Sequence, residues 1–113
     1  MRSTRDVAVG DPGDRTVHIS DPQTLVLASL AEGPKHGHAM LADILSLSGS
    51  RLGPGTLYGA ISLLEEKGFI EALPSEERRQ PYRITPRGLE LLRAKLTTLH
   101  RFSTAGLKRL GAL

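Results

Sequence analysis

The segment of residues 53–73 constrains the fold most strongly, because a short amphipathic helix in it leads directly into a strand. Pro54 suits the first position of a helix, and Gly68 suits the residue just past its end. Between them the large apolar residues recur at helical spacing: Leu57, Ile61 and Leu64. The run Phe69–Leu73 that follows is strand-like. In a chain of 113 residues, this order predicts one small domain that combines helices with short strands.

The residues after this strand predict a β-hairpin. Residues 74–81 form a polar turn with a proline at each end, and prolines there should stop the strands from extending. In residues 82–85 the side chains alternate, so that Tyr82 and Ile84 share one face. A mainly α fold with one small hairpin after its third helix is typical of a winged helix-turn-helix. In that fold one helix enters the major groove of DNA and the hairpin, or wing, touches the flanking backbone.

Composition and capping signals divide the chain into three parts. Residues 1–20 are polar and cannot bury enough apolar surface to offset their ordering entropy, so we expect a mobile N-terminal arm. Within this arm, residues 17–19 could form a short strand. Residues 21–85 are predicted to form the winged helix-turn-helix domain, and residues 86–113 a C-terminal dimerisation helix.

Two helices are expected ahead of the third. Asp21-Pro22 is a cap followed by proline, so the first helix should begin there and end at Gly33-Pro34. The second should begin near His36-Gly37 and end before residues 48–50.

The C-terminal helix carries a seam of leucines that favours a dimer. It begins at Thr85-Pro86, its pattern weakens at residues 103–106, and residues 107–113 could fray or form a separate turn. Leucines at 3-4-3 spacing suit packing against another helix, and little of the chain remains to cover them. The first helix is apolar on more than one face, which suits the core or a subunit contact. We therefore predict a homodimer held by Leu25, Leu89, Leu92, Leu96, Leu99 and Phe102.

Composition narrows the class of partner. The net charge of +3 and pI near 9.7 suit a polyanion. The absence of cysteine excludes disulfides, thiol catalysis and Cys-ligated zinc, and fits a reducing cytoplasm. No stretch has the length of a membrane span, and the polar start has no signal-peptide core. We expect a cytoplasmic protein that has no membrane association.

The residues do not suggest catalysis, a metal or a cofactor. The acidic residues include two adjacent pairs that we expect to be exposed, Glu65-Glu66 and Glu76-Glu77, and no glycine-rich phosphate loop or nucleophile elbow is present. His36 and His38 are close in sequence, but their i, i+2 spacing points them to different faces of a helix. We predict no enzyme activity, no metal and no cofactor.

Several runs of this sequence carry a family resemblance. They are His36-Gly37, Leu52–Tyr58, Leu64–Ile70 and Arg78–Gly88, within a span from about residue 25 to 99. In order and spacing they resemble the PadR family of bacterial transcriptional regulators. The resemblance implies a winged-helix domain, a C-terminal dimerisation helix, and repression of a promoter through a pseudo-palindromic operator. The short C-terminal part implies the compact subfamily with one helix after the wing.

The chain departs from the family pattern at several places. His38 stands where the family often has tyrosine, and Gly59 and Ser62 stand where basic residues are frequent. The chain has no tryptophan, so the tryptophan-lined drug slot of multidrug-binding members is not expected. The identity of any small-molecule effector is left open.

The predicted contacts to double-stranded DNA come from the third helix, the wing and two flanking positions. Hydroxyl groups near a helix N-terminus suit phosphate oxygens, and a glycine lets the backbone approach the duplex closely. Arginines on the wing suit the DNA backbone or the minor groove. The candidate residues are Lys35, Arg51, Thr56, Tyr58, Gly59, Ser62, Arg78, Arg79 and Arg83.

Other readings stay open for these residues. Tyr58 could simply cover the core, the wing arginines could pair with Glu76 and Glu77, and Lys35 and Arg51 could be solvated. A winged-helix interaction module without DNA binding is the main alternative function, and the uncharged surface at Gly59 and Ser62 of the third helix keeps it open. A winged-helix regulator of another family, such as the MarR type, is a further alternative.

Overall fold

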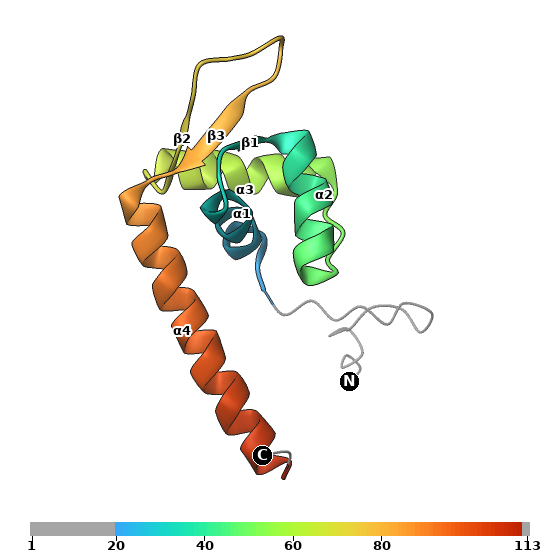
Figure 1. The fold of residues 1–113 in the computed structure, drawn as a ribbon, viewed down its shortest axis with the longest axis vertical. Coiled ribbons are helices and arrows are strands. Elements are labelled where there is room, and N and C mark those ends of the chain that lie inside the picture. The colour runs from blue at the N-terminus through green and yellow to red at the C-terminus, as the bar shows by residue number, and fades with distance from the viewer. Residues whose placement is uncertain (1–19, 112–113) are drawn as a thin grey trace, which may run out of the picture.

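The computed structural model describes residues 20–111, and all structural statements below concern that range. It contains four helices and a small sheet, as the sequence predicts, with the long α4 projecting from a body formed by the other elements (Figure 1). The predicted arm of residues 1–20, including its possible strand, lies outside the described residues except for Ser20. In chain order the elements are α1 (Pro22–Ala31), β1 (Lys35–His36), α2 (Gly37–Ser48), α3 (Pro54–Glu66), β2 (Ile70–Ala72), β3 (Pro81–Ile84) and α4 (Pro86–Arg109).

Helix α1 lies at the centre of the body. Asp21 caps it by accepting a hydrogen bond of 2.7 Å from the backbone N–H of Thr24, and Pro22 takes a position that needs no hydrogen-bond donor. Its side chains are buried on several sides, and it contacts α2, α3 and α4. A helix that is apolar all round belongs inside a fold, and α1 is the element against which the others pack.

The core joins α1 to the helix-turn-helix formed by α2 and α3. Met40 and Ile44 of α2 and Leu57 and Ile61 of α3 are fully buried or nearly so. Each such side chain contributes about 1.5–3 kcal/mol by leaving water. Gly49 ends α2 with a φ of 78°, a left-handed conformation that glycine adopts without steric cost. This packing fixes α3 relative to α2 and leaves one face of α3 outside.

The sheet has the order β1-β3-β2, with both pairings antiparallel. Strands β2 and β3 form the predicted wing, whereas β1 was not predicted: His36, expected to begin the second helix, ends this strand and pairs with Pro81. A strand of two residues has too little pattern to be detected from sequence. It matters for the site because it holds the base of the wing against the start of α2.

Helix α4 runs unbroken for 24 residues to Arg109, so the helix continues through residues 103–106, where the apolar pattern weakens, and the possible fraying is not seen in residues 107–109. Thr85 caps it by accepting a hydrogen bond of 3.1 Å from the backbone N–H of Gly88. A side chain at Gly88 would collide with the backbone oxygen of Phe69, so only glycine fits at this crossing. The first turns of α4 pack on the body, and the rest accounts for much of the 49 Å length of the molecule.

Candidate nucleic-acid interface

The outward face of α3 carries small and polar residues. Leu57, Ala60, Ile61 and Leu64 are buried against the body. The opposite face exposes Gly55, Thr56, Tyr58, Gly59 and Ser62. A Cβ added at Gly55 or Gly59 would meet no atom of the chain within 4 Å, so the helix backbone there lies open. The predicted residues of α3 are therefore all available to a ligand outside the fold.

Tyr58 connects α3 to the start of α2. Its side chain is 48% exposed, and the covered part lies on Gly37, where any added side chain would collide with the phenol ring and hydroxyl. Tyr58 thus lies at the junction of the two helices while its other face remains accessible. Nearby, burial and the negative charge of Glu65 raise the pKa of Tyr82, with a smaller effect from Tyr58.

The wing ends in a tight turn that carries two arginines. The backbones of Glu76 and Arg79 exchange hydrogen bonds of 2.9 and 2.7 Å, and the residues between them, Glu77 and Arg78, have φ values of 46° and 70°. Both φ values lie in the left-handed region of the backbone, which residues other than glycine, asparagine and aspartate rarely adopt. Gln80 ties the two arms together by donating to the backbone oxygens of Leu73 and Pro81, at 2.6 and 3.0 Å.

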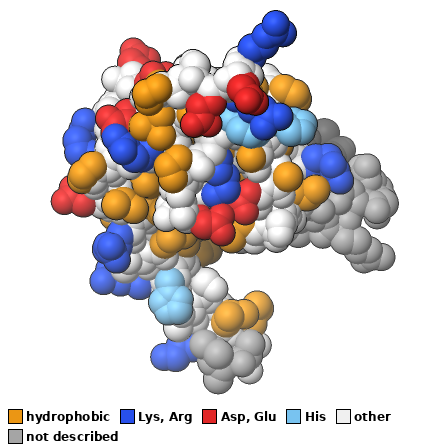
Figure 2. Space-filling model, turned by 45° about the horizontal axis from the view of Figure 1, so that its top comes forward, with side chains coloured by type: hydrophobic (Ala, Val, Ile, Leu, Met, Phe, Trp, Pro, Cys, Tyr) orange, Lys and Arg blue, Asp and Glu red, His pale blue; other side chains and the backbone are white. Residues whose placement is uncertain are grey.

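The guanidinium groups of this turn form no ion pair within residues 20–111, so the predicted alternative of pairing with Glu76 and Glu77 is not seen. Arg79 instead lies 3.3 Å from the Nε2 atom of His36. Arg78 and Arg79 share a hollow of about 290 Å³ with the start of α2. None of its lining residues is acidic: they are His36, Gly37, His38, Tyr58, Arg78, Arg79 and Gln80. Figure 2 shows histidine and basic side chains side by side, with acidic side chains next to them on the same face.

Two predicted DNA contacts have carboxylate partners within the protein. The Nζ atom of Lys35 lies 2.9 Å from Glu32 and 3.8 Å from Asp43, and donates to the backbone oxygen of Ser29 at 2.6 Å. Arg83 donates to one Glu71 carboxylate oxygen from Nε at 2.9 Å and from Nη2 at 2.6 Å.

These partners change the set of candidates. The Lys35 side chain is also mostly covered, with only 15% of it exposed. Its charge is therefore paired within the protein, and its ammonium group does not extend into solvent. We therefore leave Lys35 and Arg83 out of the proposed contact surface. Arg51 is exposed at the turn between α2 and α3 and stays a candidate.

The predicted dimer residues separate into two groups. Leu25 and Leu92 are 6% exposed and belong to the protomer's own core, where α1 and α4 meet. Their side chains are covered already, so we omit them from the proposed dimer contact. The other four are exposed on α4: Leu89 by 42%, Leu96 by 46%, Leu99 by 36% and Phe102 by 75%.

The exposed apolar face of α4 extends further than predicted. Leu107 and Leu110 continue it, with 42% and 82% exposure. They border an apolar hollow of about 590 Å³ together with Leu99, Phe102, Ser103 and Gly106. We call the exposed residues Leu89, Leu96, Leu99, Phe102, Leu107 and Leu110 the α4 seam. The helical spacing of Leu107 and Leu110 relative to Leu99 was a usable signal, but Gly106 interrupted the pattern.

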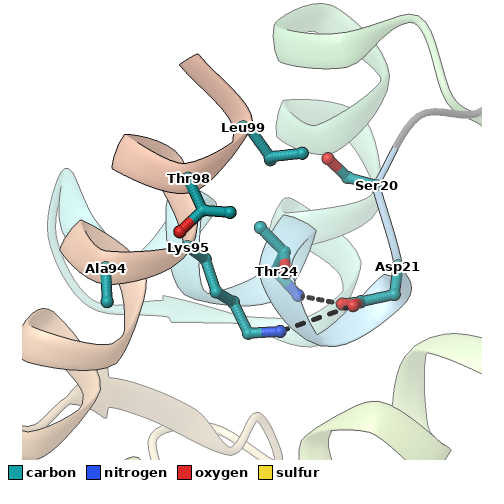
Figure 3. A pocket seen from close by; sticks show the side chains of 7 residues that line it. All are labelled: Ser20, Asp21, Thr24, Ala94, Lys95, Thr98 and Leu99. Carbon is teal, nitrogen blue, oxygen red and sulfur yellow. Dashed lines mark hydrogen bonds and ion pairs between the residues drawn. The ribbon is translucent and has the colours of Figure 1, made fainter. Parts of the chain in front are cut away.

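A second hollow lies between the start of α1 and the middle of α4. Its volume is about 330 Å³, and Figure 3 shows Asp21 between the backbone of Thr24 and the ammonium group of Lys95, which is 3.5 Å away. Partial burial acts to raise the pKa of Asp21, but the hydrogen bonds from Thr24 and the charge of Lys95 outweigh it, so the pKa is lowered. This contact ties α4 to the capped end of α1.

No group of three or more His, Cys, Asp or Glu side chains is placed to hold a metal ion among residues 20–111. In the same range, no helix is both long enough and apolar enough to cross a membrane.

Sequence comparison identifies the family. The sequence profile of the transcriptional regulator PadR-like family matches residues 26–94. The chain is also 46% identical over 87 residues to an uncharacterized 37.1 kDa protein in transposon TN4556 of Streptomyces fradiae. That match covers 77% of this chain and 25% of the relative, so the chain spans about a quarter of the relative's length.

Solved structures show the same architecture. A transcriptional regulator from Clostridium thermocellum has 30% identity and a TM-score of 0.70, over 77% of this chain and 87% of that one. A PadR family regulator from Eggerthella lenta has 29% identity and a TM-score of 0.68, over 80% and 82%. A PadR family regulator from Clostridium difficile, at 23% identity and a TM-score of 0.66 over 79% and 96%, shows the likeness in fold alone. The chain therefore belongs to the PadR-like family of transcriptional regulators and has its winged-helix fold.

Proposed function

We propose that this protein is a transcriptional repressor that binds an inverted-repeat DNA operator as a homodimer. The observation that carries the proposal is the combination of an open α3 face with the acid-free hollow beside it. A family of transcriptional regulators acts on DNA, and these two surfaces are the ones that a winged helix offers to a duplex. Repression follows where the operator overlaps a promoter, because the bound dimer would then block the polymerase.

The α3 face would enter the major groove. Thr56 and Ser62 can donate or accept hydrogen bonds at base edges or phosphates, and the threonine methyl can contact a thymine methyl. Gly55 and Gly59 have no side chain, so the helix backbone can come close to the bases. Recognition would then depend on close fit and a few hydroxyl groups rather than on long basic side chains.

The basic hollow would hold the phosphate backbone beside the groove. Arg78 and Arg79 come from the wing, and Tyr58 comes from α3, so that one phosphate could touch both elements. Arg51 at the turn before α3 could bind a second phosphate. Each phosphate that a cation neutralises releases counterions, so affinity should fall steeply as salt rises.

The α4 seam would pair two protomers. Phe102 and Leu110 are mostly exposed large apolar side chains, and hydrophobic side chains are visible on the projecting end of α4 in Figure 2. Burying this face against a second copy removes apolar surface from water. Two protomers related by a twofold axis present two α3 helices, and DNA geometry requires about 34–36 Å between them for adjacent major grooves.

Arg87 provides a rigid connection between pairing and DNA recognition. Its guanidinium stacks 4.8 Å from the centre of the Phe69 ring and donates to the backbone oxygen of Lys67 at 2.8 Å. The start of α4 is thereby fixed to the end of α3. The geometry of the dimer would consequently set the spacing of the recognition helices.

The proposal is tested with fluorescein-labelled duplexes that tile the DNA upstream of the protein's own gene. Fluorescence anisotropy should detect binding that weakens steeply between about 50 and 200 mM salt. Tyr58→Ala and Arg79→Ala should each weaken binding about tenfold, whereas Arg93→Ala, on the exposed side of α4, should not.

Light scattering should give the mass of a dimer, and Phe102→Glu should shift it toward the monomer. Binding that is absent at low salt, or that both Tyr58→Ala and Arg79→Ala retain at full strength, contradicts the proposal.

A second candidate function is a winged-helix module that docks a protein rather than DNA. The charge-free face of α3 between Gly55 and Ser62 is the observation that favours it. The same titration separates the two, since a protein-docking module would ignore every duplex at low salt while remaining folded.

A further inference from the structure

His36 contacts two groups that compete for it. It is the last residue of β1 and the cap of α2, where its Nδ1 atom lies 3.3 Å from the backbone N–H of Ala39. Its Nε2 atom lies 3.3 Å from Nη1 of Arg79, 43 positions further along the chain on the wing. Both neighbours of the ring are hydrogen-bond donors. Each contact can therefore be a hydrogen bond only if the imidazole nitrogen facing it is the acceptor.

A neutral imidazole has one nitrogen that accepts and one that donates. If Nδ1 accepts from Ala39, the ring proton is on Nε2 and faces the guanidinium of Arg79. If Nε2 accepts from Arg79, the proton is on Nδ1 and faces the backbone N–H of Ala39. Protonation of the ring removes both acceptors. The α2 cap and the Arg79 contact thus exclude each other as full hydrogen bonds.

We propose that His36 is a positioning residue for Arg79: in the DNA-free protein its Nε2 lone pair holds the guanidinium over the start of α2, ready for a phosphate. The inference rests on the proposed function, because it says how Arg79, on the wing side of the proposed DNA-contact surface, is positioned before DNA binds. The wing tip needs such a support, since Glu77 and Arg78 hold a left-handed turn that does not itself fix the long Arg79 side chain.

Phosphate binding resolves the competition. When a phosphate oxygen replaces the imidazole as the acceptor for Arg79, the ring proton can move to Nε2 by solvent exchange. Nδ1 then accepts from the N–H of Ala39 without competition from Arg79, so the cap of α2, present at 3.3 Å in the DNA-free structure, is strengthened in the bound state. DNA capture by the wing and the ordering of the α2 start would therefore reinforce each other.

The substitution His36→Asn isolates the positioning role. Asparagine is a good helix cap and can still accept from Ala39, but the other group of its amide donates and cannot accept from Arg79. Folding should be unaffected, with circular dichroism and Tm close to wild type. Operator binding should weaken about three- to tenfold, the loss expected for one hydrogen bond.

A double-mutant cycle tests whether this loss passes through Arg79. In an Arg79→Ala background, His36→Asn should cause no further loss on the tightest-binding upstream duplex. In an Arg78→Ala background, which removes the neighbouring arginine of the same turn, the full three- to tenfold loss should persist. The slope of log affinity against log salt should also become shallower in His36→Asn, since a misplaced Arg79 releases fewer counterions. A merely structural role would lower affinity without changing that slope.

Three results would overturn the inference. In the first, the wild-type protein binds DNA, Arg79→Ala weakens the binding, and His36→Asn does not. This result leaves the proposed function intact and removes the role of His36. Additive losses in both arginine backgrounds show that His36 does not act through Arg79. Wild-type protein that binds no duplex at low salt refutes the proposed function and this inference together.

Discussion

Gly59→Ala should make the protein more stable and its DNA binding weaker. Gly59 lies inside α3, and a Cβ built there meets nothing within 4 Å. Replacing an exposed glycine inside a helix by alanine gains roughly 0.5–1 kcal/mol, because the unfolded chain loses freedom and the helix gains propensity. For a domain of this size that gain raises Tm by about 2–8 °C.

The effect on binding should have the opposite sign. If the α3 backbone lies against the bases, the added methyl group pushes the helix out of the groove. Overpacking a tight contact costs about 1–3 kcal/mol, so operator affinity should fall at least fivefold. Stability is measured by thermal unfolding and affinity by anisotropy on one duplex at fixed salt.

Ser46→Ala provides the matched control. Ser46 is exposed near the end of α2, so this substitution also raises helix propensity but should leave affinity unchanged. The reasoning is refuted if Gly59→Ala raises Tm and keeps affinity within twofold of wild type, because the α3 backbone would then not approach the duplex.

Three further predictions follow from single contacts. Gly88→Ala should destabilise the fold by about 1–3 kcal/mol in urea unfolding, because its methyl group would collide with the Phe69 backbone oxygen; a stability equal to wild type would show that α4 can shift. Arg78→Gly should stabilise the wing by up to about 1 kcal/mol, since glycine accepts its φ of 70°, while weakening DNA binding and making its salt dependence shallower. Asp21→Asn should lose less than about 1 kcal/mol at pH 7, because the Lys95 contact is partly exposed. The pKa of Asp21 is lowered from 3.8, so its contribution is present above that pH and is lost as pH falls through the folded value; the difference in stability between wild type and variant should shrink as pH is lowered below 3.8, and a constant difference would contradict the assignment.

Local signals made most of the fold predictable. Pro54 and Gly68 bound α3 closely, and the cap-plus-proline pairs at residues 21–22 and 85–86 mark the starts of α1 and α4. These signals depend only on neighbouring residues, which is why they survive in a single sequence. The two-residue β1 carries no such signal, because its pairing partner Pro81 lies far along the chain.

Contacts between residues account for the pairings around the candidate site that the sequence did not reveal. Lys35 is paired with Glu32, only three residues before it, and α2 adds Asp43 as a second carboxylate partner. The Arg83 pair was in principle accessible, since Glu71 faces Arg83 directly in the hairpin register, but the register was unknown. Leu92 and Leu96 share one leucine pattern, and only the position of α1 decides which is covered within the protomer.

Hydroxyl-radical footprinting on the upstream DNA tests the central claim most directly. A dimer that presents two α3 helices should protect two patches whose centres lie about one helical turn apart, symmetric about the axis of an inverted repeat. Tyr58→Ala should lose both patches at the same protein concentration. A single protected patch, or uniform protection that ignores sequence symmetry, would contradict paired recognition through α3.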